Sequence, residues 1–323
     1  LLERLADGQT HSGEQLAAAL GISRAAIWKH LQALRRETGL DITSISGRGY
    51  RLAEPLELLQ AARLTAQIDV TRVPSIEDLA LHRSVDSTNA VLLQGPAPGR
   101  QRARICIAEH QSAGRGRRGR TWQSPFGYNL YLSLAWRFDL GLSDLAALSL
   151  AVGVGLARAL QRCGVTGHGL KWPNDLLLEE RKLGGILVEA KGEVGGPATA
   201  VMGVGLNLRL PETARAQIEQ PSIALADAGL SHLSRNQIAG VVIDELLATC
   251  DRYAREGAEP ALREWPEFDH YRDRRVHLHL ADQTLTGHYR GIDALGRLIL
   301  EQDHGREHFF AGEVSLRRDA ADA

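Results

Sequence analysis

The chain has 323 residues, of which 44% are hydrophobic and 24% charged, and its formal net charge is −1. These proportions are typical of a globular protein of two or three domains and exclude a disordered or collagen-like chain. A net charge so close to zero gives no general affinity for nucleic acid, so any DNA binding must come from a local basic patch.

The sequence contains no uncharged run of eighteen apolar residues, and it does not open with a charged segment followed by an apolar one. We therefore expect a cytoplasmic protein with neither a membrane span nor a secretory signal. Cys106, Cys163 and Cys250 are widely separated within apolar segments, which favours reduced, buried thiols over disulfides or a zinc site. His277 and His279 alternate as on a solvated strand face, an interpretation favoured over metal binding.

Residues 1–62 are expected to form a DNA-binding domain and a linker that contains a helix around 56–63. Ser12 and Ser23 have the position and chemistry of helix caps, and Gly21 is placed to end the first of these two helices. Glycines at 47 and 49 favour a hairpin directly after the second helix. With a short, fraying helix at the start, this pattern predicts a winged helix-turn-helix.

The outer face of the helix that Ser23 begins carries hydrogen-bond donors and a flat ring, which suit base edges and phosphates. The candidate DNA-binding residues are Ser23, Arg24, Ala25, Trp28, Lys29, Gln32 and Arg36, with Arg48 at the tip of the wing. Residues 1–52 hold seven Lys or Arg against five Asp or Glu, so electrostatic steering towards DNA is weak. A winged helix used for protein contact is the alternative.

Residues 63–268 alternate predicted strands and helices and form the expected catalytic domain. Strands are predicted at 81–85, 103–109, 129–136, 170–172, 175–178, 182–190 and 198–208, and helices at 145–163 and around 238–253. Hairpin-length gaps between several of the strands favour a mixed or antiparallel sheet over a doubly wound one.

Residues 269–323 differ in their sequence pattern, which predicts short strands joined by tight turns. Strands are predicted at 276–280, 284–292, 297–300 and 307–310. This spacing is typical of a small SH3-like β-barrel. The fold class is therefore α+β: an N-terminal winged helix-turn-helix, a central mixed-sheet domain and a C-terminal barrel.

The segment from Gly114 to Arg120 places four arginines in six residues, separated by glycines. Its glycines fit G-x-G-x-x-G, but Trp122 and Pro125 follow where a dinucleotide site needs a helix, so we reject that interpretation. The arginines repel one another, and we expect a loop that stays mobile until an anion binds. Guanidinium groups and glycine amides can then close round the charge. A basic loop that contacts DNA is the alternative.

Lys171-Trp-Pro-Asn-Asp175 lies between two predicted strands. A lysine at a strand end can neutralise a carboxylate or an α-phosphate, and Asn174 and Asp175 can orient a substrate or hold a phosphate-bound Mg²⁺. Lys182 follows a predicted turn and returns a second ammonium to the same place. Alone, this motif is more often a turn with a structural tryptophan.

Ser87-Thr-Asn89 follows a predicted strand and, on its own, is best interpreted as a helix cap. Gly203-Val-Gly-Leu-Asn207 ends another strand, with glycines that allow close approach of the backbone. Hydroxyls, amides, lysines and the arginine loop thus converge at strand ends, which suits an anion-rich reaction. The chain lacks the order of residues of a Ser-His-Asp hydrolase and has no P-loop motif.

Together these motifs resemble the bacterial family of bifunctional biotin–protein ligases and biotin-operon repressors. The resemblance covers nearly the whole chain and rests on segments 12–16, 23–27, 47–50, 86–89, 114–119, 124–127, 171–175, 181–187, 203–207, 291–293 and 312–316. It implies the ligase fold shared with lipoate ligases, plus the winged helix of repressor-type members. It also implies formation of biotinyl-5′-AMP from biotin and ATP, transfer of biotin to a lysine of the biotin carboxyl carrier protein of acetyl-CoA carboxylase, and biotin-responsive repression of biotin synthesis genes.

The resemblance also implies roles for individual residues. Biotin would contact Ser87, Thr88, Asn89, Gln111, Gly114, Arg115, Gly116, Arg117 and Lys182. ATP or the adenylate would contact Arg117, Arg118, Arg120, Lys171, Asn174, Asp175 and Asn207. Lys171, Lys182 and Arg117 would be catalytic, and Mg²⁺ would arrive with ATP and lie beside Asn174 and Asp175.

The resemblance implies a homodimer that forms when the adenylate is bound and presents two winged helices to an inverted-repeat operator. In better-known repressor members an aromatic residue closes a loop over the adenine, whereas residues 211–222 contain none, so adenine closure is expected to be differently built here. Two rival hypotheses are a biotin-sensing transcription factor without ligase activity, against which Lys171 and Lys182 argue, and a lipoate–protein ligase, which does not need the arginine–glycine loop.

Overall fold

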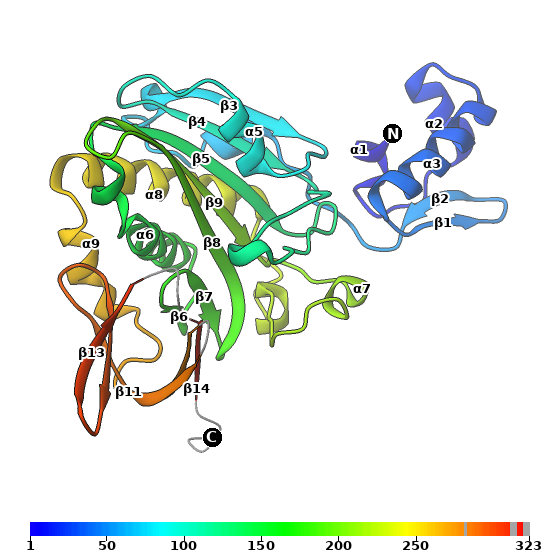
Figure 1. Cartoon of the computed structure of the whole chain (residues 1–323). Helices are drawn as coiled ribbons and strands as arrows, with labels where there is room; N and C mark the ends of the chain where they lie inside the picture. The colour runs from blue at the N-terminus through cyan, green and yellow to red at the C-terminus, as the bar shows by residue number, and fades with distance from the viewer. Residues whose placement is uncertain (281–282, 311–314, 319–323) are drawn as a thin grey trace.

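The computed structural model describes residues 1–280, 283–310 and 315–318. A small helical domain with a two-stranded hairpin comes first, a seven-stranded sheet with helices on both faces follows, and a five-stranded sheet comes last. Figure 1 shows the first part (blue) to one side of the large sheet and the last part (orange to red) below it. The α+β class and the order of the three parts are as the sequence predicts.

The first part is a winged helix. Its elements are α1 (Leu2–Leu5), α2 (Gly13–Leu20), α3 (Arg24–Thr38), β1 (Ile42–Ile45) and β2 (Gly49–Leu52). The side chains of Ser12 and Ser23 accept hydrogen bonds from backbone N–H groups in the first turns of α2 and α3, and Gly21 ends α2 in the left-handed conformation. These three sequence predictions are confirmed.

The core of the winged helix extends into the rest of the chain. Ile27 and Leu31, on the inner face of α3, are fully buried in one apolar cluster. The same cluster contains Leu56 of the linker and Phe126, which belongs to the central part of the chain. Phe126 follows the arginine–glycine segment closely in sequence, so the winged helix packs against the segment that leaves that loop.

The linker itself is held by polar contacts. A helix is predicted around 56–63, whereas α4 spans Ala61–Thr65. Residues before α4 stay extended because their backbone donates to side chains of the central part: the N–H of Leu59 to Glu109 at 2.8 Å, and that of Gln60 to Asn236 at 2.8 Å. A helical turn there would take these donors away from buried acceptors.

The central sheet contains seven strands. They are β3 (Ile76–His82), β4 (Ala103–Ala108), β5 (Leu130–Phe138), β6 (His168–Lys171), β7 (Asp175–Leu178), β8 (Arg181–Gly192) and β9 (Ala198–Leu206). Their spatial order is β3-β4-β5-β9-β8-β7-β6. β3 and β4 pair in parallel and every other neighbouring pair is antiparallel, which confirms a mixed sheet. The prediction of the first strand at 81–85 is wrong, because β3 begins at Ile76, where polar residues of a half-exposed edge strand hide the pattern.

Helices cover both faces of this sheet. α6 (Leu148–Arg162) and α8 (Arg235–Glu256) pack together on one face, and α5 (Thr88–Gln94) lies on the other (Figure 1). Alternate residues of β5 serve the two faces, as Leu132 joins the large core and Ala135 joins the small cluster beneath α5. The remaining helices are α7 (Glu212–Arg215) and α9 (Glu259–Glu264), with 3-10 turns at Val73–Ser75, Arg117–Gly119, Leu142–Leu145, Leu225–Ala228 and Trp265–Glu267.

One stretch of the described residues, Leu142–Arg162, is long and apolar enough to cross a membrane by length and composition alone. Most of its apolar window, 67%, is buried within the molecule. The stretch ends in α6, which contacts α8, β6, β7 and β8, so its apolar character is explained by its place in the core.

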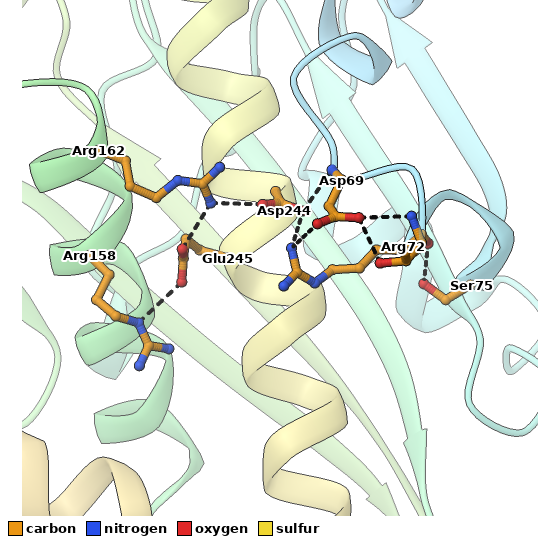
Figure 2. A network of polar contacts seen from close by, with 8 residues as sticks. Asp69, Arg72, Ser75, Arg158, Arg162, Asp244 and Glu245 are labelled. Carbon is orange, nitrogen blue, oxygen red and sulfur yellow. Dashed lines mark hydrogen bonds and ion pairs between the residues drawn. The ribbon is translucent and has the colours of Figure 1, made fainter.

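A charge network around the buried carboxylate of Asp244 ties the segment between α4 and β3 to α6 and α8 (Figure 2). Asp244 on α8 is 1% exposed and accepts from Arg72 of that segment and Arg162 of α6, both at 2.7 Å. Burial on its own raises the pKa of Asp244, but these hydrogen bonds outweigh it and lower the pKa. Glu245, next along α8, pairs with Arg158 and Arg162. The network connects the two core helices to the segment that precedes β3.

The last part is a small all-β domain. Its strands are β10 (Arg275–His279), β11 (Thr284–Ile292), β12 (Leu298–Gln302), β13 (Gly305–Phe309) and β14 (Ser315–Arg318), all antiparallel in the order β13-β12-β11-β10-β14. Within the described residues β13 and β14 do not pair with each other, so the expected barrel is seen there as an open sheet. Residues 312–314 of the segment 312–316 lie outside the described residues.

Candidate functional site

A cavity lies where the arginine–glycine segment meets strand ends of the central sheet, on the face that carries α5. Its wall comprises residues 87–89, 111, 115–118, 120–122, 171–175, 182, 185–187, 203–205 and 220. All the residues predicted to bind biotin or ATP line it, apart from Gly114 and Asn207. Segments far apart in the sequence therefore form one site.

One end of the cavity is polar and buried. Ser87 occupies the N-cap position of α5, as the sequence predicts, but within the described residues its side chain makes no capping hydrogen bond. Gln111 Oε1 accepts from the backbone N–H of Thr88 at 2.9 Å and lies 3.1 Å from the hydroxyl oxygen of the same residue. Asn89 donates its amide to Glu189 at 2.8 Å and to the carbonyl of Leu187 at 3.2 Å.

The arginine–glycine segment folds into a small hairpin over this cavity. Trp122 N–H donates to Gly114 O at 2.9 Å, and Gly116 N–H donates to Arg120 O at 2.7 Å. The sequence predicts a mobile loop without an anion, but each of two guanidinium groups has an acceptor on the opposite wall. Arg115 pairs with Glu189 at 3.2 Å, and Arg117 donates to Asn174 Oδ1 at 2.9 Å. These bonds hold the hairpin across the cavity.

Arg117 is the arginine of the hairpin that contacts the Lys171–Asp175 motif. Burial lowers the pKa of its guanidinium, and repulsion by Arg118 lowers it further, while Asp175 opposes the change. Its bond to Asn174 joins the hairpin to the Lys171–Asp175 motif. An anion between the two would relieve the repulsion among the arginines.

The two predicted lysines share one carboxylate. Lys182 Nζ lies 2.8 Å from Asp175 Oδ1, and Lys171 Nζ lies 3.6 Å from Asp175 Oδ2. Burial on its own raises the pKa of Asp175, but the ammoniums of Lys182 and Lys171 outweigh it, so the net change is a lowered pKa and a permanent negative charge. The lysine side chains are only 16% and 19% exposed. The arrangement holds two half-buried cations beside one carboxylate.

Bare backbone forms the floor of the cavity. A side chain on Gly205 would lie 2.5 Å from the ring of Trp122, and one on Gly203 would lie 2.3 Å from Asn89 Oδ1. These glycines of β9 therefore let Trp122 and Asn89 approach the sheet, as the sequence predicts. The indole of Trp122 lies beneath Lys182 Nζ, which is 5.6 Å from the ring centroid, and the buried indole N–H has no hydrogen-bond partner in the part of the chain that the structure describes.

Asn207 and the segment after it contact the backbone of Lys182. Asn207 is buried and donates to the carbonyls of Lys182 and Ile223, at 3.4 and 3.3 Å. The backbone of Lys182 also pairs with Pro221 and Ile223, and Gln220 reaches the cavity wall. Residues 211–222, which have no aromatic side chain, are thus anchored to the strand that carries the lysine.

The motif tryptophan links the site to the C-terminal domain. Trp172 is fully buried, and its indole N–H donates to Gly296 O in the turn between β11 and β12, at 3.0 Å. The structural interpretation of this tryptophan is therefore correct, and it applies beside the functional interpretation of Lys171 and Asp175.

The winged helix presents the predicted DNA-binding side chains on its surface. Arg24, Ala25, Trp28, Lys29 and Arg36 of α3 and Arg48 of the wing are exposed, with Gln32 half-buried beside them. Trp28 is 54% exposed, which is rare for so large an apolar ring. The Ser23 hydroxyl is engaged in capping α3.

Comparison with known proteins places these features in one family. The model of the Biotin/lipoate A/B protein ligase family matches residues 81–207, an HTH domain model matches 1–51, and a Biotin protein ligase C terminal domain model matches 273–317. The chain is 44% identical over 317 residues to the bifunctional ligase/repressor BirA of Salmonella typhimurium, covering 98% of this chain and 96% of that protein. The chain belongs to the BirA family.

Other BirA-family proteins are similar over the same length. The Escherichia coli BirA is 43% identical, with 98% of this chain and 96% of that protein covered. Among solved structures, a biotin protein ligase from Aquifex aeolicus in complex with biotin and ATP has a TM-score of 0.63 and 25% identity, covering 75% of this chain and all of that one. Membership of the BirA family accounts for the joint presence of the winged helix, the cavity and the C-terminal domain.

Several residues of this BirA-family site are not found by sequence reasoning. Trp122 follows the arginine loop and would be a candidate from its position alone. Glu189 and Ser133 give no such signal, since a polar residue at one position of a strand is common. Their contacts with Arg115 and Asn89 arise only when β5, β8 and the hairpin are brought together.

Proposed function

We propose that the cavity binds biotin and ATP and makes biotinyl-5′-AMP, and that the same site then passes biotin to a lysine of a biotin carboxyl carrier protein. The chain is in this account an ATP-dependent, AMP-forming ligase. The observation that supports it best is the pair of half-buried lysine ammoniums on Asp175, opposite a hairpin of arginines. A site for biotin alone would not need so many cations around a reacting centre.

The first step joins two anions. A carboxylate oxygen of biotin attacks the α-phosphorus of ATP, the bond to the bridging oxygen breaks, and pyrophosphate leaves. Lys171 and Lys182, with Arg117 above them, would neutralise the charge that gathers at this point. Because Asp175 already holds both ammoniums in position, little reorganisation accompanies the reaction.

The second step transfers the biotinyl group. The neutral ε-amine of the acceptor lysine attacks the carbonyl of the mixed anhydride, the C–O bond to AMP breaks, and the proton of the amine passes to water. Asp175 does not suit the role of proton acceptor, since its lowered pKa makes it a weak base. The closed hairpin would shield the anhydride from water until the carrier protein arrives.

The head of biotin would lie at the polar end formed by residues 87–89 and Gln111, with the hairpin of residues 114–117 over its chain and carboxylate. The nucleotide would extend towards Asn174, Arg118 and Arg120. Asn207 would act through the backbone of Lys182 and the anchored segment 211–222, which takes the place of an aromatic adenine lid.

Magnesium would enter with the phosphates of ATP. Asn174 and Asp175 fit poorly as its ligands in this conformation, because the Asn174 oxygen faces Arg117 and the Asp175 oxygens face two lysines. A cation there would meet three positive groups.

The same chain would act in the cytoplasm as a repressor of biotin synthesis genes. A homodimer that forms with bound adenylate would place two copies of α3 and the wing on successive grooves of an operator. Contact between Phe126 and the winged-helix core gives the site a direct physical route to the DNA-binding domain.

Incubation with ATP, radiolabelled biotin and an acceptor domain tests the ligase directly, with an acceptor that lacks its lysine as the control. We expect label on the intact acceptor alone. Transfer of lipoate but not biotin would instead support a lipoate ligase, and binding of biotin without transfer would support a pure sensor. A gel shift with operator DNA, with and without biotin and ATP, and sedimentation under the same conditions test repression and dimerisation.

A further inference from the structure

A line of short hydrogen bonds runs beneath the polar end of the cavity, and a serine outside every predicted set lies in its middle. Ser133 of β5 is fully buried. Its hydroxyl oxygen lies 2.6 Å from Asn89 Oδ1 and 2.7 Å from Thr88 Oγ1. Thr88 lines the cavity and is 4% exposed, so its remaining bonding capacity is directed to a ligand rather than to bulk water.

The hydrogen-bond partners of Asn89 fix the orientation of its side-chain amide. Its amide nitrogen faces two groups that can only accept, the carboxylate of Glu189 at 2.8 Å and the carbonyl of Leu187 at 3.2 Å. The oxygen of the same amide must therefore face Ser133. That oxygen brings no proton to the contact.

The number of available protons fixes the direction of the hydrogen bonds from Thr88 to Ser133 and from Ser133 to Asn89. The 2.6 Å contact between Ser133 and Asn89 needs one proton, and only Ser133 can supply it. The 2.7 Å contact between Ser133 and Thr88 needs another, and only Thr88 has one left to give. Gln111 Oε1 is satisfied separately by the backbone N–H of Thr88. Thr88 Oγ1 then offers lone pairs alone to whatever binds in the cavity.

We propose that Ser133 is a positioning residue for specificity: by taking the proton of Thr88, it makes Thr88 Oγ1 an obligatory hydrogen-bond acceptor, and the site therefore selects a head group that offers an N–H. This inference rests on the proposed function, in which that N–H belongs to the ureido ring of biotin. Ser133 does not touch the ligand and acts only through Thr88.

The order of protons is strongly held because the groups involved are buried. Reversing it would leave Asn89 Oδ1 and Ser133 Oγ as two acceptors facing each other without a proton between them. In a buried network an unpaired polar group is costly, so the whole line keeps one polarity. If a ligand had an oxygen in place of the N–H, the lone pairs of that oxygen would face the lone pairs of Thr88 Oγ1 and the two groups would repel each other.

The test compares biotin with two cyclic carbamates, in each of which one ureido N–H is replaced by a ring oxygen. The measured quantity is kcat/KM for ligand-dependent exchange of pyrophosphate into ATP by the full chain. A site built to pair with an N–H rejects an analogue that lacks it strongly. We expect the native chain to discriminate against at least one carbamate by about a hundredfold or more.

Ser133→Ala releases the proton of Thr88, which can then turn either towards Gln111 Oε1, 3.1 Å away, or towards the ring oxygen of the carbamate. We expect the discrimination to fall to about tenfold or less, with kcat for biotin at saturation nearly unchanged. Ser133→Cys keeps a weak donor in the same place and should give an intermediate ratio, which also keeps the test open if the alanine variant folds poorly. Thr249→Val is the matched control, since it removes a buried hydroxyl on α8, outside the cavity.

The outcomes distinguish failure of the proposed function from failure of the proposed role of Ser133. If the native chain shows no exchange with biotin, the proposed function fails. If it uses biotin but accepts both carbamates equally well, or if both Ser133 variants keep the native ratio, the proposed function stands and the role of Ser133 is overturned. A lower ratio in Thr249→Val as well would assign the effect to loss of rigidity and also overturn it.

Discussion

The cavity and the exposed face of α3 both carry cationic side chains that we propose to bind anions, but they hold them in opposite ways. In the cavity Lys171 and Lys182 are mostly buried and share Asp175. On α3 the side chains of Lys29 and Arg36 are exposed, beside a tryptophan that is 54% exposed. Fixed cations in a dry site suit a reaction in which charge must be stabilised at one point, whereas solvated cations suit a long polyanion that is bound by displacing its counterions.

The two regions should therefore respond differently to substitution. Removing one cation from the cavity leaves a buried carboxylate poorly paired and disturbs every group around it. Removing one from α3 is expected to delete a single phosphate contact with little effect on the fold, because the side chain is exposed.

Lys182→Met keeps the length of the side chain and removes the ammonium that is closest to Asp175. We expect kcat/KM for biotin-dependent pyrophosphate exchange to fall by about a hundred- to a thousandfold, because one of the groups that stabilise the transition state is lost. Lys191→Met, on the exposed end of the same strand, is the control and should be near native. Equal activity of the two variants would contradict the role of Lys182.

Arg117→Gly removes the bond from the hairpin to Asn174 and loosens its closure over the cavity. A hydrogen bond from a charged group of this kind contributes enough to change the escape of a bound product by about tenfold or more. We expect biotinyl-5′-AMP to be released faster and to label bystander proteins, as measured by quenched-flow release and by labelling of added albumin. An adenylate half-life no different from that of the native chain, or of an Arg83→Gly control in an exposed bend, would refute this.

Lys29→Ala on α3 should weaken operator binding several-fold and lower the slope of log affinity against log salt by about one. The ligase activity should not change, since no residue of α3 is among the described residues that line the cavity. Binding is measured by fluorescence anisotropy at several salt concentrations, with Arg4→Ala in α1 as the control. A loss of ligase activity in Lys29→Ala would remove the distinction between the two regions.

The smallest effect concerns Asp269, which lies between the ligase part and the C-terminal sheet and accepts from Trp265 and Tyr289, at 3.0 and 2.7 Å. Burial raises the pKa of its carboxyl to about 6. Because the folded state prefers the protonated form, this contribution to stability is complete below the unfolded pKa and is lost as the pH rises through about 6.

Asp269→Asn cannot ionise, so its stability relative to the native chain should improve as the pH rises from 4 to 7. The expected change in the difference between the two melting temperatures is about 2–4 °C. Thermal unfolding at a series of pH values measures it, with exposed Asp303→Asn as the control. A difference that does not vary with pH would show that Asp269 is ionised throughout.

Local chemistry made much of this molecule predictable. Capping by Ser12 and Ser23 depends on residues within one turn, and β7 and β11 have the predicted bounds because apolar residues or tight turns mark their ends. The strands that carry the lysines were found for the same reason. Edge strand β3 was misplaced because its first half is exposed and polar.

What escaped prediction depends on contacts between distant segments. Glu189 becomes part of the site only through Arg115 and Asn89, which are 74 and 100 residues away in sequence. Ser133 is an ordinary small residue of a buried strand until Asn89 and Thr88 are set against it. The hairpin form of the arginine loop likewise requires acceptors on the opposite wall, and no local pattern contains them.

Exchange of radiolabelled pyrophosphate into ATP measures whether the two half-buried ammoniums on Asp175 serve to activate biotin with ATP. The native chain should catalyse exchange only when biotin is present, and Lys182→Met should show little. Exchange that is absent from the native chain, or that proceeds equally without biotin, would contradict the account.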